Sequence, residues 1–141
     1  MISFLTGEFL NDLKHGKGDL KTKDGMRYLG SFSYGKIEGF GTATWPGGVK
    51  YEGEWLKGLK SGKGRFTFKN GDVYEGDFVE DFPHGVGKLL RYDGAVFTGC
   101  WKDGKAHGLL AYQKGAETNL YESSLEGNRQ ELFPLGSKER N

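Results

Sequence analysis

The chain has 141 residues, the length of about one domain. Its 20 basic and 19 acidic side chains leave a formal charge of +1, which excludes a strong overall field for nucleic acid or an anionic surface. Apolar residues make up only 35% of the chain and 25 residues are glycine, a composition that argues against a thick helical core and favours a shallow β structure.

The amino-terminal stretch and the cysteine usage predict a cytoplasmic protein. The sequence MISFLTGEF lacks the basic start and the long apolar run of a signal peptide, and no apolar run approaches the ~20 residues of a membrane-spanning helix. Cys100 is the single cysteine, so an internal disulfide is excluded.

A repeat of 23 residues organises most of the chain. Tyr28, Tyr51, Tyr74 and Phe97 follow one another at this spacing, and most glycines keep the same register. Such a period is typical of arrays in which each repeat packs on its neighbours. We therefore predict a repeat array over residues 1–119, with five units that start near residues 5, 28, 51, 74 and 97.

Each unit has the pattern of a β-hairpin. In the third unit, alternation over YEGEW puts Tyr51 and Trp55 on one face of a strand and the two glutamates on the other. A turn-like segment, LKGLKSG, leads to a second strand, KGRFTFK, and the Asn70-Gly71 pair that follows is a strong hairpin signal. Five such hairpins predict an all-β fold, an elongated single-layer antiparallel meander.

The aromatic rings share one face of this predicted sheet. A single sheet has no second layer to bury them, so the rings have to lie along the sheet, and we expect glycines beside them to make the room. The curved plate would then carry an aromatic groove that holds a helix or an extended peptide of a partner protein. The predicted groove residues are Tyr28, Phe32, Trp45, Tyr51, Trp55, Phe66, Tyr74, Phe78, Phe97 and Trp101.

Apolar residues also recur at the predicted turns, where polar residues are the rule. Their recurrence predicts a turn ridge along one edge of the plate. Two interpretations stay open: these residues tuck under the sheet and seal its edge, or they bind a partner helix, the carboxyl-terminal segment or a second copy of the chain. The predicted ridge residues are Leu13, Ile37, Leu59 and Phe82.

Residues 120–141 leave the 23-residue frame, and we predict a capping segment and a mobile tail there. Ser123 and Glu126 have the spacing of a capping box, which predicts a short helix, with an irregular tail as the alternative. No second strand is expected after Tyr121.

The sequence shows no motif for catalysis, a metal or a cofactor. GSFSYGK and GCWKDGK come close to a phosphate-binding loop, but neither lysine precedes Ser or Thr, and strands flank both. His15, His84 and His107 hold equivalent places in their units, about 10 Å or more apart, and are interpreted as turn residues. Cys100 is interpreted as a bystander. We predict no catalytic residue, metal ligand or cofactor.

Charged residues on the face opposite the rings are predicted to pair across each hairpin. Glu52 and Glu54 would face Lys63 and Arg65, and each such pair contributes about 0.2–1 kcal/mol. Because this pairing occupies the lysines that a lipid site would use, we expect weak or no phospholipid binding. Nucleic acid is not an expected partner.

Three segments, YEGEWLKGLKSGKG, YEGDFVEDFPHGVG and FTGCWKDGKAHG, resemble the MORN repeat (membrane occupation and recognition nexus) over about residues 5 to 119. Departures from its pattern are Leu5, Asp12, Asp81 and Leu110, and the two leucines are interpreted as changes at the ends of the array. The resemblance implies a chain of β-hairpins that serves as an assembly or interaction module. Members are associated with cytoskeletal structures, ciliary axonemes and membrane contact sites, and some carry a lipid kinase domain.

These observations predict a non-catalytic scaffold or adaptor that binds a protein partner. Its location would be cytoplasmic, in a cytoskeletal, ciliary or membrane-apposed assembly. Open sheet ends leave unpaired backbone groups, which makes a homodimer a natural expectation. The alternative is a phosphoinositide-docking or regulatory module of a lipid kinase or another enzyme.

Overall fold

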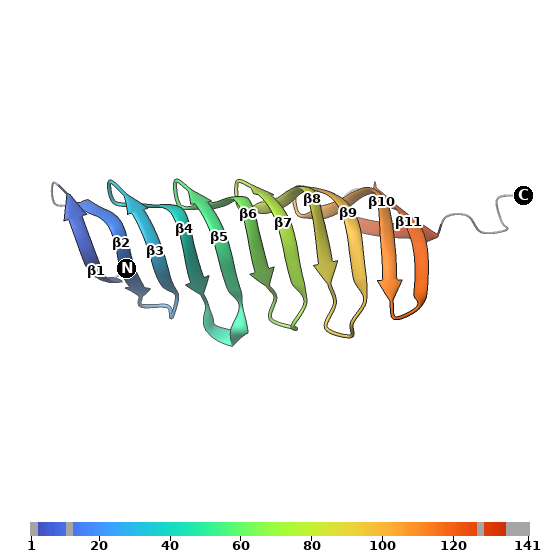
Figure 1. The fold of residues 1–141 in the computed structure, drawn as a ribbon, viewed down its shortest axis with the longest axis horizontal. Coiled ribbons are helices and arrows are strands. Elements are labelled where there is room, and N and C mark those ends of the chain that lie inside the picture. Colours follow the sequence, from blue (N-terminus) through green and yellow to red (C-terminus); the bar gives the residue numbers. More distant parts are fainter. Residues whose placement is uncertain (1–2, 11–12, 127–128, 135–141) are drawn as a thin grey trace, which may run out of the picture.

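The computed structural model of the chain describes residues 3–10, 13–126 and 129–134. Twelve strands form one antiparallel sheet in which each strand pairs with its neighbours in sequence (Figure 1). The predicted all-β single-layer meander is therefore confirmed. The strands are β1 (Ser3–Leu10), β2 (Leu13–Thr22), β3 (Arg27–Ser33), β4 (Lys36–Thr44), β5 (Lys50–Leu56), β6 (Leu59–Thr67), β7 (Val73–Val79), β8 (Phe82–Leu90), β9 (Val96–Lys102), β10 (Lys105–Lys114), β11 (Glu117–Glu126) and β12 (Arg129–Pro134).

Helix is almost absent from the part of the chain that the structure describes. Its one helical element is the three-residue 3-10 turn η1 (Pro46–Gly48) in the connection from β4 to β5. Across the described ranges, no helix has the length and apolar character needed to cross a membrane.

The hairpin turns are shorter than the sequence predicts. Leu56 and Leu59 pair as the ends of β5 and β6, so the turn of the third unit consists of Lys57 and Gly58 alone. The rest of the predicted turn segment belongs to β6, where Gly62 has a φ of +70° and the pairing register shifts. This extra length is a β-bulge, which bends a strand and increases its twist.

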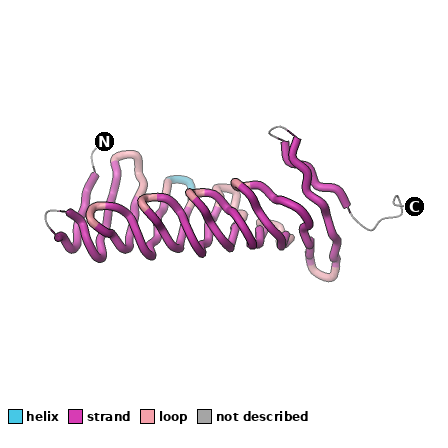
Figure 2. Tube along the Cα trace, turned by 90° about the horizontal axis from the view of Figure 1, so that it is seen from above, coloured by secondary structure: helices cyan, strands magenta, loops and turns pink. Residues whose placement is uncertain are grey.

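The bulge recurs in every unit and shapes the whole array. Seen from above, the trace winds as a coil along the array, and the last strands leave that coil at the carboxyl-terminal end (Figure 2). The equivalent bulge glycines are Gly16, Gly39, Gly85 and Gly108, all at positive φ. One face of the sheet is thereby wrapped inward, and this inner face carries the core.

The connections between hairpins follow the predicted turn chemistry. After β6, the backbone N–H of Phe68 donates to the carbonyl of Asp72 at 2.8 Å, and the N–H of Gly71 donates back to the carbonyl of Phe68 at 3.0 Å. Asn70-Gly71 therefore lies at a tight turn, as its sequence predicts.

The carboxyl-terminal segment forms two strands, so the predicted helix and the predicted absence of a second strand are both wrong. β11 and β12 form a sixth hairpin, with Tyr121 paired to Pro134 and Glu126 paired to Arg129. Pairing with β10 satisfies the backbone groups of a sheet edge, and the Gly-Asn dipeptide at 127–128 is typical of hairpin connections and unfavourable in a helix. The predicted tail at 135–141 lies outside the described residues, as do the side chains of Leu5 and Asp12.

Candidate functional site

The first ring of each central unit stands over a pair of facing glycines. The Tyr51 hydroxyl donates to the carbonyl oxygen of Glu54 at 2.8 Å, and a methyl group at Gly64 would overlap that hydroxyl. Tyr28 and Tyr74 repeat the arrangement, and burial raises the pKa of each to about 12. The glycines thus make room for the rings, as the repeat pattern predicts.

The second ring of each unit joins the first rings into one column. Tyr51 packs edge to face against Trp55 and against Phe78 of the next unit, with 5.0 Å between ring centroids in both cases. The same contact joins Tyr28 to Trp55 and Tyr74 to Trp101, at 5.5 Å. Edge-to-face packing is a favoured arrangement of aromatic rings, so the column joins successive hairpins.

Burial divides the predicted groove residues into two groups. Seven of them form the core and are at most 9% exposed: Tyr28, Phe32, Tyr51, Trp55, Tyr74, Phe78 and Trp101. The other three, Trp45, Phe66 and Phe97, are half-buried against that core. The second group, with its neighbours, is therefore the part of the aromatic face that is accessible without unfolding the array.

Phe68 packs beside Phe66 but is not among the predicted groove residues. Its ring lies 4.9 Å from that of Phe66, which lies 6.4 Å from the ring of Trp45. Phe68 remains 39% exposed. Its alternation with Phe66 along the KGRFTFK strand is the signal that could have placed it in the groove.

A lysine lies among these rings. The ammonium group of Lys60 is 5.4 Å from the centroid of Phe66 and 5.7 Å from that of Trp45, distances at which a cation is attracted to a ring face. Asp81 holds it in place: the Asp81 carboxylate accepts from the Lys60 backbone N–H at 2.9 Å and from its ammonium at 3.2 Å. Asp81 stands where the second, third and fifth units carry a turn glycine and has a φ of +82°.

Beside this lysine the inner face opens into a hollow of about 300 Å³. Four phenylalanine side chains contribute to its wall, and the paired Lys60 and Asp81 supply its charges. The lining residues are Lys60, Phe66, Phe68, Phe78, Asp81, Phe82, Pro83 and Gly104. Among the described residues, no group of three His, Cys, Asp or Glu side chains could hold a metal ion.

The predicted turn ridge is present in three of its four residues. Leu13, Leu59 and Phe82 are 45%, 39% and 55% exposed at the turn edge. Ile37 is half-buried and packs on the core, because it is one residue out of register: it pairs with Phe32 on the inner face, and Lys36 takes the ridge position. Leu56 and Val79, on the other side of their turns, are 50% and 49% exposed.

Successive turns are hydrogen-bonded to one another. The backbone N–H of Asp81 donates to the carbonyl of Lys60 at 2.9 Å, and Gly58 and Gly104 make the same bond to Ile37 and Pro83. The predicted turn histidines, His15, His84 and His107, are instead the third residues of β2, β8 and β10, next to this edge. His15 accepts from the N–H of Tyr34 in the next unit at 3.2 Å, and His84 lies 3.8 Å from the carboxylate of Asp103.

The outer face pairs its charges between hairpins, which corrects the predicted pairing within them. Arg65 lies 3.3 Å from Glu75, and Lys63 is 2.5 Å from Asp77, both across β6 and β7. The register itself is as predicted, with Glu52 opposite Arg65 and Glu75 opposite Lys88, but the Arg65 side chain pairs with the carboxylate on its other neighbouring strand. Phe40 and Val86, two 23-residue steps apart, are also exposed on this face and were not singled out from the sequence.

Cys100 is exposed, and its Cα pairs with that of His107 on the neighbouring strand. The sequence reasoning overlooked this proximity because the two residues belong to different strands of one hairpin. A single thiol and imidazole make no metal site by themselves.

Comparison with known proteins agrees with the repeat. The MORN repeat profile matches residues 6–27, 28–50, 51–73, 74–96 and 97–109. No curated protein is significantly similar to the chain. MORN repeats are in general non-catalytic modules for interaction with proteins or membranes. With five consecutive repeats covering most of its length, the chain belongs to the MORN-repeat family.

Proposed function

We propose that this protein is a non-catalytic scaffold that binds a helical or extended segment of another protein along its aromatic groove. The hollow beside Lys60 is the observation that carries this proposal. It combines half-exposed rings with a cation that is already paired, and such surfaces favour apolar anchor side chains of a protein partner.

In the groove and on the outer strands beside it, the pairing of charges supports a protein partner over an anionic membrane. On the outer face, Lys63 and Arg65 are paired with carboxylates of the next strand. Lys60, inside the groove, is paired with Asp81. A polybasic lipid site needs roughly 4–8 clustered basic residues, and these three are already engaged.

The groove is tested by replacing one exposed ring on each face. Full-length Phe68→Ser and Phe40→Ser proteins are immobilised, and partners captured from a cell extract are identified and quantified against the unsubstituted chain. Phe68 lines the hollow, whereas Phe40 is exposed on the outer face, so Phe40→Ser is the matched control.

The proposal expects specific partners to be lost with Phe68→Ser and retained with Phe40→Ser, with both proteins keeping their β circular dichroism. Equal capture by all three proteins would show that the groove is not the contact surface.

A further inference from the structure

Four exposed apolar side chains gather on two neighbouring turns at one edge of the array. We name Leu56, Leu59, Val79 and Phe82 the apolar turn patch; they are 50%, 39%, 49% and 55% exposed. Leu56 pairs with Leu59 and Val79 with Phe82 across their turns. A hollow of about 180 Å³ lies between the turns, lined by Leu56, Leu59, Lys57, Ser61 and Glu80. Turn residues of a solvated edge are normally polar, so the exposed apolar side chains of this patch are a candidate contact surface.

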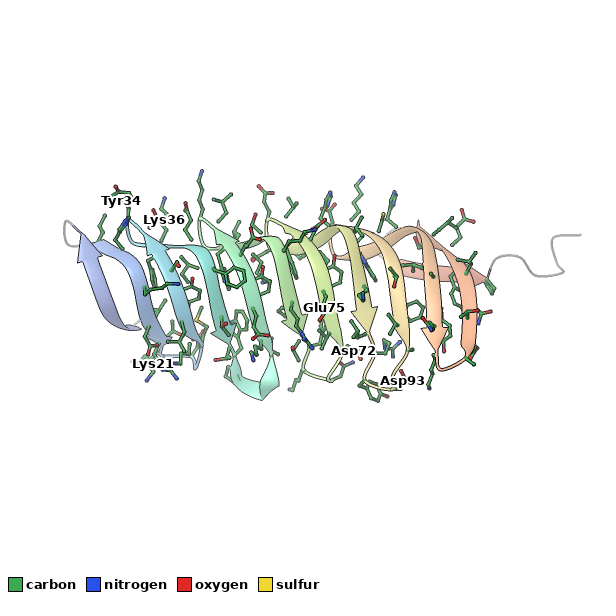
Figure 3. All side chains as sticks on the ribbon, in the orientation of Figure 1. Lys21, Tyr34, Lys36, Asp72, Glu75 and Asp93 are labelled. Atoms are coloured by element: carbon green, nitrogen blue, oxygen red, sulfur yellow. The ribbon has the colours of Figure 1, made fainter. Side chains whose placement is uncertain are left out.

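Lysines surround this patch on both sides along the edge. Lys36 and Lys57 belong to the second and third turns, and Lys102 and Lys105 flank the fifth. Figure 3 shows Lys36 projecting from this edge beside Tyr34. Within the described ranges, none of these four lysines forms an ion pair. The carboxylates at the same turns are Glu80, Asp81 and Asp103, and Asp81 is paired with Lys60, so the four lysines outnumber the two remaining carboxylates.

The spacing of the turns selects the secondary structure of the partner. Two strands per unit place successive turns about 10 Å apart. Seven residues of an α-helix rise about 10.5 Å and return to nearly the same face. Three residues of an extended strand also span about 10 Å, but an odd step turns every second side chain away from the edge. A helix with heptad spacing therefore meets successive turns with one face, and a strand does not.

We infer that the apolar turn patch docks an amphipathic helix of another protein, with leucine-like residues at heptad spacing and acidic residues beside them. This surface is separate from the groove, which lies on the inner face, although Phe82 lines both. A second copy of this chain is a poor occupant, since its own patch has the same lysine rim and like charges repel.

The direct test uses two synthetic helices of three heptads, both with Leu at positions a and d, one with Glu and the other with Lys at positions e and g. Their binding to the full-length chain is measured by fluorescence anisotropy at low and at physiological salt. We expect the Glu helix to bind at least about tenfold more tightly than the Lys helix, with a preference that declines as salt rises.

Variants locate the binding on the protein. The triple substitution Leu56→Ser, Leu59→Ser, Val79→Ser should weaken the Glu helix at least about tenfold, whereas Phe40→Ser and the groove variant Phe68→Ser should leave its affinity unchanged. The pair Lys102→Glu, Lys105→Glu should weaken the Glu helix and strengthen the Lys helix, and it provides the test independently if the triple variant fails to fold.

Several results would overturn the inference. They are equal affinity for the two helices, no binding of either, and binding that survives the triple substitution. A dimer in light scattering that the triple substitution dissolves would assign the patch to a second copy. Sedimentation with phosphatidylserine vesicles that the same substitution abolishes would assign it to a membrane. Loss of Glu-helix binding in Phe68→Ser alone would place that helix in the groove.

Discussion

The hydroxyl of Tyr51 lies over Gly64 on the neighbouring strand, and this relationship recurs for Tyr28 over Gly41 and Tyr74 over Gly87. A methyl group at Gly64 would overlap the hydroxyl and the ring of Tyr51, which is fully buried. Glycine is therefore required at this position by a side chain of the adjacent strand and not by its own backbone conformation.

Gly64→Ala should displace Tyr51 from the core and lower the free energy of unfolding by about 3–5 kcal/mol, the cost of removing a large buried side chain. Urea denaturation followed by circular dichroism measures it. On a Tyr51→Leu background the same change should cost much less, because the obstructing ring is gone. Equal costs on the two backgrounds would contradict this explanation.

In the fifth unit both residues of this tyrosine-over-glycine contact differ from the other units. Phe97 lacks the hydroxyl, and Leu110, 1% exposed, stands where the other units have the second glycine. Leu110→Gly should cost about 2–5 kcal/mol, since it leaves a cavity. Adding Phe97→Tyr should recover part of that loss by filling the space, whereas Phe97→Tyr alone should destabilise. Thermal unfolding of the four proteins gives the coupling energy, and strictly additive effects would show that the two positions are independent.

Lys60 and Asp81 form another linked pair. The hydrogen-bonded turn position is Asp81 where the residue in the preceding unit is Lys60, and it is glycine where that residue is Ile37 or Pro83. A lysine does not by itself require the aspartate, because Lys14 holds the same repeat position and is followed in the next unit by Gly35. Asp81→Gly should relieve the positive φ but leave a half-buried ammonium without its carboxylate, at a net cost of about 1–2 kcal/mol.

The matched control for that change is the double variant Lys60→Ile, Asp81→Gly, which copies the combination of Ile37 and Gly58. Its denaturation midpoint should return close to that of the unsubstituted protein. A double variant that is less stable than Asp81→Gly alone would refute the linkage.

Alkaline pH should unfold the array through its buried tyrosines. The ordinary pKa of tyrosine is about 10, and burial raises the pKa of Tyr28 and Tyr74 to about 12. Because the folded state holds these protons more tightly than the unfolded chain, their stabilising effect is complete below about pH 10 and is lost as pH rises towards about 12.

An alkaline titration that follows tyrosinate absorbance together with circular dichroism checks this expectation. Ionisation of the buried tyrosines should coincide with loss of β structure. Tyr92→Phe, at a side chain that is 69% exposed, should leave the unfolding midpoint unchanged. Complete ionisation with an intact β spectrum would show that burial does not protect these hydroxyls.

Period-two alternation and the 23-residue step predict the strands and the ring column because both depend on local spacing. They fail where a partner lies in another unit. Arg65 lies opposite Glu52 in the register of β5 and β6, yet its guanidinium group pairs with Glu75 on the other neighbouring strand. Ile37 looks like a ridge residue from its place in the turn, but it pairs with Phe32 on the inner face.

The candidate site was less predictable than the fold for a similar reason. The sequence reasoning placed ten aromatic residues in one groove, yet the ring of Tyr51 is fully buried in the core whereas the ring of Phe68 lines an open hollow. Alternation gives the face of a side chain and does not give its depth. The available signal for the hollow was the aspartate at position 81, where the second, third and fifth units have glycine.

The turn-to-turn hydrogen bonds hold successive units of the array at a regular spacing. Each bond joins a unit to the one before it, as from Gly58 to Ile37 and from Gly104 to Pro83, and no longer-range support is needed to place a unit. A duplicated unit would therefore lengthen the molecule by about 10 Å and repeat the same turn, groove and outer face at that distance. Evolution can thus change how far apart this protein holds its contacts without redesigning any of them.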